Sequence, residues 1–373
     1  MLRIDRSQSR FDYIDALRGW AILAVIFAHA ATMTRIGGSL RSFADNGFMG
    51  VHLFFVSSAF TIFHMLFKHA EQESRPIRNF FIRRLFRIVP VYWFGILFYI
   101  LVWGLLPQAK WWHYPVHLTL TNVLFPETQS SAVPGGWSIS VEVLFYASVP
   151  LWFKWVRDLS RAWIFMLVCV FILPLITIMI RKWSYPLFSG VDPYWLSVYW
   201  ERFPLNSLGS FSFGILLYFL LKDADVLAFI RWKAAGMCSI VMICATLFVL
   251  GMIPVVFPVK AHFYCFLFML LALVLSANPW KVFVNPATVF IGRISYSIYI
   301  FHFAVLTWLT VFIPAHYPNV LAHSYVYFFM VTLLLTCLTI PLAWCGYQFI
   351  ESPAINLAKQ LIARLESKKG PLK

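Results

Sequence analysis

The chain has 373 residues, of which 61% are hydrophobic and only 12% charged, and its formal net charge is +15. A soluble domain has about 45–50% apolar and about 25% charged residues, so this composition excludes an ordinary soluble protein. Long uninterrupted apolar runs exclude an outer-membrane barrel, whose strands alternate in polarity. The six cysteines lie in apolar runs without metal-ligand spacing, so we expect no metal site. We predict an all-α, polytopic helical membrane protein with about ten transmembrane helices.

The apolar runs are long enough for ten spans, joined by connections of varying length. They divide the chain into a cytoplasmic N-tail over 1–12, a membrane domain over 13–350 and a basic amphipathic tail over 351–373. We expect the spans at 13–33, 48–67, 86–106, 137–156, 162–180, 207–221, 234–252, 261–277, 289–312 and 325–348.

Lysine and arginine are distributed unevenly between the two sides of these spans. Most of the 30 fall in the tails and in the connections that follow the even-numbered spans, and such clusters mark the cytoplasmic side of a membrane. We therefore expect a multi-pass protein of the inner membrane with both termini in the cytoplasm. The positive charge also attracts anionic lipids, so membrane lipids are expected partners and nucleic acid is not.

The first expected span carries three ionisable residues, Asp15, Arg18 and His29. Each costs about 2.5–3.5 kcal/mol inside a spanning helix, so such residues mark functional sites. Arg18 and His29 are about three helical turns apart and share a face, with Asp15 one turn before Arg18. The structural alternative is that Asp15 and Arg18 form an anchoring ion pair, while His29 makes a hydrogen bond between helices.

The second expected span contains His52, Ser57 and Ser58. Serines in a spanning helix usually bond to carbonyls of their own backbone, and we expect that of both. His52 lies near the outer end of this span. We expect it to face the same cavity as His29.

The third expected span begins in a basic patch, RPIRNFFIRRLFRIVPVYW. Its Arg84 and Arg87 are one turn apart and run into the apolar segment. Guanidinium groups bind phosphate bidentately, which favours a cytosolic phosphorylated ligand such as a nucleotide or coenzyme A. The alternative is a lipid-headgroup anchor, which explains Arg75 and Arg78 better. No phosphate-binding glycine motif accompanies the patch.

Two later segments place polar side chains inside expected spans. GGWSISVEVLFY contains Glu142 with Ser138 one turn earlier, and an intramembrane glutamate is a candidate functional residue unless it pairs with an intramembrane arginine. IGRISYSIYIFHFAVL places Tyr299 and His302 on one helical face. The closing FIESP contains Glu351, which we expect to be a cap or an ion-pair partner.

Six segments resemble, in this order, the motifs of the acyltransferase-3 family of integral membrane O-acyltransferases: ALRGWAILAVIFAHA, GVHLFFVSSAF, RRLFRIVPVYW, WSISVEVLFY, SYSIYIFH and FIESP. The resemblance covers the chain from about Phe11 to Pro353. It implies ten spans and transfer of an acyl group, often acetyl, from acyl-coenzyme A to a hydroxyl of an envelope carbohydrate. No esterase-like domain follows the spans, so we expect the membrane domain or a separate protein to complete the transfer.

The functional residues of that family match three pairs in this chain: Arg18 with His29, Arg84 with Arg87, and Trp137 with Glu142. Two positions of the second span depart from the family. His52 stands where many members have aspartate, and Ala59 replaces the usual glycine.

Together the residues and the resemblance predict a mechanism. Arg84 and Arg87, helped by Arg18, hold the phosphates of the acyl-coenzyme A donor, which is not permanently bound. His29 is the general base for the acceptor hydroxyl, or alternatively carries the acyl group, and Glu142 orients its imidazole. The acceptor is an envelope glycan or a lipid-linked sugar. Supporting roles are expected for Asp15, His52, Trp137, Ser138, Tyr299 and His302.

A proton-coupled transporter is the competing function. Buried Asp, Arg, His and Glu residues also form the proton relays of carriers. Carriers are commonly built from inverted repeats with paired broken helices, and this sequence has no such repeat that we can detect. The sequence therefore favours the enzyme.

Overall fold

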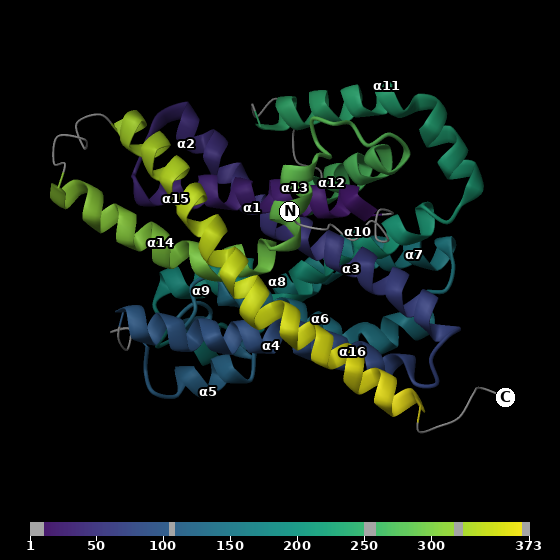
Figure 1. Cartoon of the computed structure of the whole chain (residues 1–373), viewed down its shortest axis with the longest axis horizontal. Helices are drawn as coiled ribbons and strands as arrows, with labels where there is room; N and C mark the ends of the chain where they lie inside the picture. Colours follow the sequence, from purple (N-terminus) through teal and green to yellow (C-terminus); the bar gives the residue numbers. More distant parts are fainter. Residues whose placement is uncertain (1–10, 104–108, 250–258, 317–323, 368–373) are drawn as a thin grey trace.

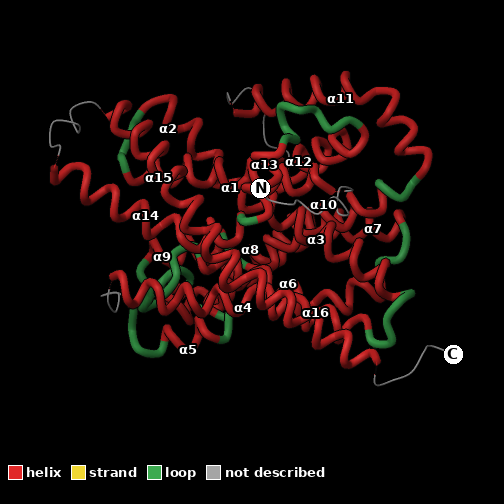
Figure 2. The backbone as a smooth tube through the Cα atoms, in the orientation of Figure 1, coloured by secondary structure: helices red, strands yellow, loops and turns green. Residues whose placement is uncertain are grey.

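The computed structural model describes residues 11–103, 109–249, 259–316 and 324–367. In these ranges the chain consists of helices joined by loops and turns, without strands (Figure 2). Ten residues of the expected N-tail and residues 368–373 of the expected C-tail lie outside the described ranges.

Helix α1 (Asp12–Met33) lies at the centre of the helix packing. The helices packed against it include α2 (Gly38–Asp45), α3 (Gly50–Ala70), α12 (Lys260–Ala277), α13 (Pro286–Arg293), α14 (Ser295–His316) and α15 (Ser324–Gly346). The tightest approach is to α13, where a Cβ atom on Gly19 would lie 2.2 Å from the carbonyl oxygen of Thr288. Only glycine permits this backbone contact.

The remaining elements complete a bundle around these helices (Figure 1). They are η2 (Asn46–Met49), α4 (Pro76–Trp103), α5 (His113–Leu118), η3 (Asn122–Leu124), η4 (Pro126–Thr128), α6 (Gly136–Trp155), α7 (Leu159–Leu167), η5 (Val168–Ile172), α8 (Leu173–Ser184), η6 (Tyr185–Phe188), α9 (Pro193–Glu201), α10 (Pro204–Leu220), α11 (Ala224–Val249), η8 (Tyr347–Glu351) and α16 (Ser352–Ser367). Elements η5 and η8 are π-helices, and η2, η3, η4 and η6 are 3₁₀-helices.

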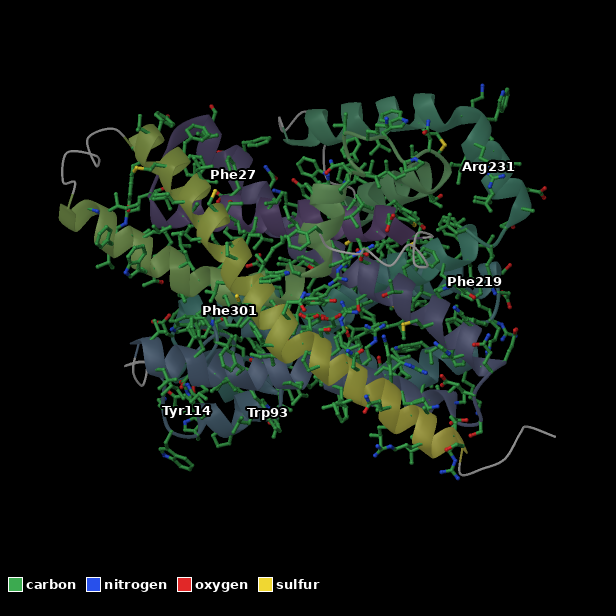
Figure 3. All side chains as sticks on the ribbon, in the orientation of Figure 1. Phe27, Trp93, Tyr114, Phe219, Arg231 and Phe301 are labelled. Carbon is green, nitrogen blue, oxygen red and sulfur yellow. The ribbon has the colours of Figure 1, made fainter. Side chains whose placement is uncertain are left out.

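Eight helices or helix runs in the described ranges are long and apolar enough to cross a membrane. Helices α6 and α11 occupy the other two expected spans. Large apolar side chains remain exposed on several helices, for example Leu101, Ile178 and Leu333, as expected of surfaces that face lipid. Phe301, near the middle of Figure 3, is buried, whereas Arg231 lies outward on α11. The chain is therefore an all-α, multi-pass membrane protein.

The ninth expected span, 289–312, is wrong as a single helix. A capping box between Asn285 and Thr288 begins α13, and the chain breaks at Ile294 before α14 starts. The break leaves Arg293 at the end of α13, 3.3 Å from Asp12. Arginine at a helix C-terminus also complements the helix dipole.

The C-terminal segment continues the last span. Helix α15 passes through the π-helix η8 directly into α16, which crosses α4 (Figure 1). Ala354, Ala358 and Ile362 are buried at helical spacing along this segment. The expected amphipathic helix therefore forms and packs on the protein, and its contact with the membrane surface stays a prediction.

Candidate functional site

A cavity between α1, α3, α4, α6 and α14 gathers most of the predicted polar residues. The residues that line it include Arg18, Ser58, Arg84, Arg87, Ser138, Glu142, Tyr146, Ser295 and Tyr299. Three guanidinium groups therefore face one carboxylate, so the lining is positively charged. A cavity of this sign attracts and concentrates anionic ligands.

Arg84 is a buried cation without a carboxylate partner in the described part of the chain. Its side chain is 6% exposed, its Nε atom has no hydrogen-bond partner there, and Nη2 only approaches the sulfur of Met65 at 3.8 Å. Its guanidinium lies over the rings of Phe80 and Tyr146, 6.0 and 5.4 Å from their centroids. Burying an unpaired charge is costly, so this arrangement favours an anionic ligand as the missing partner.

Arg87 and Arg18 are similarly weakly paired. Within the described residues Arg87 has no hydrogen bond or ion pair. Arg18 donates from Nη2 to the hydroxyl of Ser295 at 3.1 Å and lies 3.9 Å from Asp15. Asp15 is nearer to Arg293, at 3.4 Å. The expected ion pair between Asp15 and Arg18 is therefore long, and Arg18 shares the Asp15 carboxylate with Arg293.

Glu142 belongs to this cavity and not to the imidazole of His29. One of its carboxylate oxygens accepts hydrogen bonds from the hydroxyls of Ser58 and Tyr146, both at 2.5 Å. His29 does not line the cavity. The expectation that Glu142 orients His29 is therefore wrong, because α6 turns this carboxylate towards α3 and α4. Ser57 bonds to the carbonyl of Leu53 as expected, but Ser58 does not bond to its own backbone.

His29 lies against a second histidine, on α14. Its ring centroid is 5.3 Å from that of His302 and 4.4 Å from that of Phe303, with Phe48 at 4.9 Å. His29 is half-buried, and no hydrogen bond of its imidazole is found among the described residues. Its ring contacts are therefore all with aromatic or imidazole neighbours in the described ranges.

His302 is fully buried and has a defined tautomer. Its Nδ1 atom lies 2.8 Å from the carbonyl oxygen of Tyr299 and 3.2 Å from that of Ile298. Carbonyls only accept hydrogen bonds, so Nδ1 carries the proton and Nε2 is a bare acceptor. No partner for Nε2 occurs in the described chain.

Tyr299 connects the cavity to the two histidines. Its hydroxyl accepts from Ser138 at 2.9 Å and donates to the carbonyl of Gly135 at 3.1 Å, while its ring lies 5.7 Å from that of His302. Gly135 precedes α6 with φ +74°, a conformation that favours glycine. A Cβ atom there would lie 2.8 Å from the Tyr299 hydroxyl. Tyr299 thus lies between the arginine cavity and the pair His29 and His302.

Two predicted supporting residues lie elsewhere. The Nδ1 atom of His52 is 2.9 Å from the hydroxyl of Ser210 on α10, and neither residue lines the cavity. His52 therefore contacts α10, and the expectation that it shares a cavity with His29 stays a prediction. Trp137 also lies outside the lining, with the guanidinium of Arg202 4.9 Å from its ring.

A polar loop supports the start of α6. His117 bonds to the hydroxyl of Tyr92 at 2.7 Å and to the carbonyl of Thr128 at 2.7 Å. Burial lowers the pKa of His117 to about 4, so its neutral ring serves both partners at neutral pH. Ser140 of α6 donates to the carbonyl of Leu120 at 2.6 Å in the same loop.

Sequence reasoning missed Tyr146 and Arg202, assigned Ser58 to its own backbone, and left the partner of Glu351 open. Tyr146 was within reach of prediction because it follows Glu142 by one helical turn. Glu351 is buried and accepts a hydrogen bond from Ser297 at 2.9 Å. This contact joins η8 to α14, and no sequence pattern predicts it.

Comparison with known proteins identifies the family. The family model described as "Acyltransferase domain" matches residues 11–347. "Putative O-acetyltransferase SACOL0978" of Staphylococcus aureus (strain COL) is 25% identical over 91% of this chain and 56% of the relative. "O-acetyltransferase OatA" of S. aureus (strain NCTC 8325) is 25% identical over 96% of this chain and 59% of the relative. The chain therefore spans little more than half the length of these curated relatives.

No solved structure matches the chain significantly. The family match covers most of the sequence, and it includes the helices that supply the arginine cavity and the two histidines. The chain belongs to the acyltransferase-3 family.

Proposed function

We propose that this protein is a membrane O-acyltransferase that moves an acyl group, expected to be acetyl, from acyl-coenzyme A to a hydroxyl of an envelope carbohydrate. The observation that carries the proposal is the cavity in which Arg18, Arg84 and Arg87 face one carboxylate. Family membership supplies the reaction class, and the O-acetyltransferase names of the relatives favour acetyl.

The arginine cavity is the proposed donor site. Guanidinium groups bind phosphate oxygens bidentately, and each hydrogen bond to a charged group contributes about 1.5–3 kcal/mol. A bound phosphate would stabilise Arg84 most, because this buried arginine has no ion-pair partner and the phosphate would supply one. We assign Glu142 to shaping this cavity through its bonds to Ser58 and Tyr146.

The two histidines form the proposed reaction site. His29 lies roughly 16 Å further along α1 than Arg18, so the long pantetheine arm of the donor would pass Tyr299 towards it. There the free imidazole acts as general base on the acceptor hydroxyl, a role worth about 10²–10⁴-fold in rate. Trp137 offers an apolar face for a sugar, and the Arg202 guanidinium over its ring is close enough for its charge to act on His29.

The distribution of lysine and arginine supports an inner-membrane location with both termini in the cytoplasm. In that orientation the start of α4 and the arginine cavity lie towards the cytosol, where acyl-coenzyme A is made. The acceptor, a glycan or lipid-linked sugar, would meet His29 towards the opposite side.

Purified protein in lipid vesicles tests this function. Acetyl-coenzyme A labelled in the acetyl group is added outside, and isolated envelope glycan is supplied as acceptor. The proposal requires label in the glycan and release of free coenzyme A. Uptake of an intact solute driven by a proton gradient, without thioester cleavage, would instead identify a carrier. Mass spectrometry of envelope glycans from cells with and without the protein then locates the modified hydroxyl.

A further inference from the structure

We propose that His302 is a positioning residue that fixes which nitrogen of His29 acts as the base. The role of His29 as a base rests on the proposed function. The effect of His302 on the tautomer of His29 rests only on the contact between the two histidines. His302 is fully buried on α14, and its Nε2 atom lacks a partner in the described part of the protein. A buried acceptor without a donor is costly unless a donor reaches it.

The backbone of α14 determines what His302 offers to its neighbour. Nδ1 is held by the carbonyl of Tyr299 at 2.8 Å, so the proton stays on that side of the ring. Nε2, on the other side, can only accept a hydrogen bond. His29 is the neighbouring polar ring, 5.3 Å away between centroids and inclined by 40°.

The side chain of His29 supplies the missing donor. Catalytic hydrogen bonds are often long in the absence of substrate and tighten in the complex. His29 is half-buried and makes no hydrogen bond to another described residue, so no existing bond of its ring has to break before an N–H turns towards His302. An N–H of His29 then faces Nε2 of His302, and its second nitrogen, which is bare, faces the acceptor hydroxyl.

This arrangement defines the path of the proton. The bare nitrogen of His29 takes the proton of the acceptor hydroxyl as that oxygen attacks the thioester carbonyl. The new ester C–O bond forms, the C–S bond breaks, and its electron pair leaves with the coenzyme A thiolate. His29 becomes doubly protonated, and the bond to His302 holds its ring in place. His302 itself gains no proton and touches no substrate, as expected for a residue that orients a base.

Tyr299 couples this pair to the donor site. Its carbonyl holds His302, while its side chain lines the arginine cavity. The orientation of the base and the shape of the donor site therefore depend on the same turn of α14.

The test compares His302→Phe, which cannot accept a hydrogen bond, with His302→Gln, whose amide oxygen can. Nitrogen-15 NMR of histidine-labelled protein in lipid nanodiscs reports the tautomer of each imidazole without substrate. We expect Nδ1–H on His302 and a single neutral tautomer of His29 in the parent. His302→Phe should give a mixture of both His29 tautomers, and His302→Gln should restore one. His52→Phe, which removes a half-buried histidine bonded to Ser210 and outside the pair, should leave the His29 signal unchanged.

Kinetics with acetyl-coenzyme A and isolated envelope glycan supply the second readout. His302→Phe should lower kcat roughly tenfold, the loss of one hydrogen bond in the transition state, with unchanged affinity for coenzyme A. His302→Gln should recover most of this rate. An unaltered His29 tautomer in His302→Phe, or a proton on Nε2 of His302 in the parent, overturns the inference. A parent with the expected tautomers and no acyl transfer overturns the proposed function instead.

Discussion

The arginines on the two faces of α4 differ in whether they form ion pairs. Arg83 forms an ion pair with Glu73, and Arg78 lies 3.0 Å from Glu366 on α16. Neither Arg84, the very next residue after Arg83, nor Arg87 one turn later forms an ion pair within 4 Å in the described ranges, although the buried Glu351 is the strongest opposite charge acting on Arg87. A cation paired within the protein stabilises the fold. A cation left unpaired inside a cavity is available for a ligand.

The paired face is a connected network that fixes the start of α4. Asn79 donates to Glu73 and to Glu366, each at 2.9 Å, and Glu366 also accepts from the backbone N–H of Ser74. These bonds tie the turn before α4 to α16. The network therefore holds the helix that presents Arg84 to the cavity.

The largest expected effect is that of His29→Gln, which should lower the rate of transfer without changing donor affinity. His29→Gln retains a hydrogen-bonding side chain but cannot take a proton at neutral pH, so transfer should fall by about 10²–10⁴-fold. Donor affinity, which depends on the unpaired arginines of α4, should stay as in the parent. Transfer rates and coenzyme A titrations on the same preparation measure both. Retained transfer in His29→Gln would leave His29 a structural residue.

The next effect tests the unpaired face of α4. Arg84→Lys or Arg87→Lys keeps the charge but loses the two-pronged geometry. Each lost charge-assisted hydrogen bond costs about 1.5–3 kcal/mol, which corresponds to roughly ten- to hundredfold weaker donor binding.

The matched control for that test is Arg75→Lys. Arg75 is exposed and outside the cavity, so its replacement should leave donor affinity unchanged. Equal weakening in Arg75→Lys and Arg84→Lys would mean that the basic patch acts only through its overall charge.

A smaller effect is expected on the paired face. Glu73→Gln removes the charge that holds Arg83 and should lower the free energy of unfolding by about 1–3 kcal/mol. Donor affinity should change little, because the pair lies outside the cavity lining. Thermal unfolding in detergent, followed by coenzyme A titration, measures the two quantities. A large loss of donor affinity without loss of stability would show that the two faces are not distinct.

The sequence was sufficient to group the arginines of the cavity but not to predict the contacts inside it. Arg84 and Arg87 could be grouped because helical spacing places them one turn apart. Arg18 joined them because the cationic starts of two expected spans lie at the same side of a membrane. The start of α13 was also readable, since Asn285 followed by Pro286 is a helix start.

The partners of Glu142 and His29 could not be predicted. Spacing within one helix gives the face of a side chain, but which helix that face meets depends on packing between distant segments. Glu142 meets Ser58, and His29 meets His302, across separations that no local pattern encodes. The resemblance to the family grouped Glu142 with His29 in function, and the structure separates them.

The most direct test of the account is a binding cycle that combines Arg84→Lys with removal of the phosphates from the ligand. Affinities of parent and variant are measured for acetyl-coenzyme A and for acetyl-pantetheine, which lacks the nucleotide and its phosphates. If Arg84 holds phosphate, the parent prefers acetyl-coenzyme A, and Arg84→Lys loses about ten- to hundredfold of that preference. Acetyl-pantetheine should bind both proteins alike. An equal preference for acetyl-coenzyme A in parent and variant would contradict the claim that the unpaired arginines of α4 bind the donor.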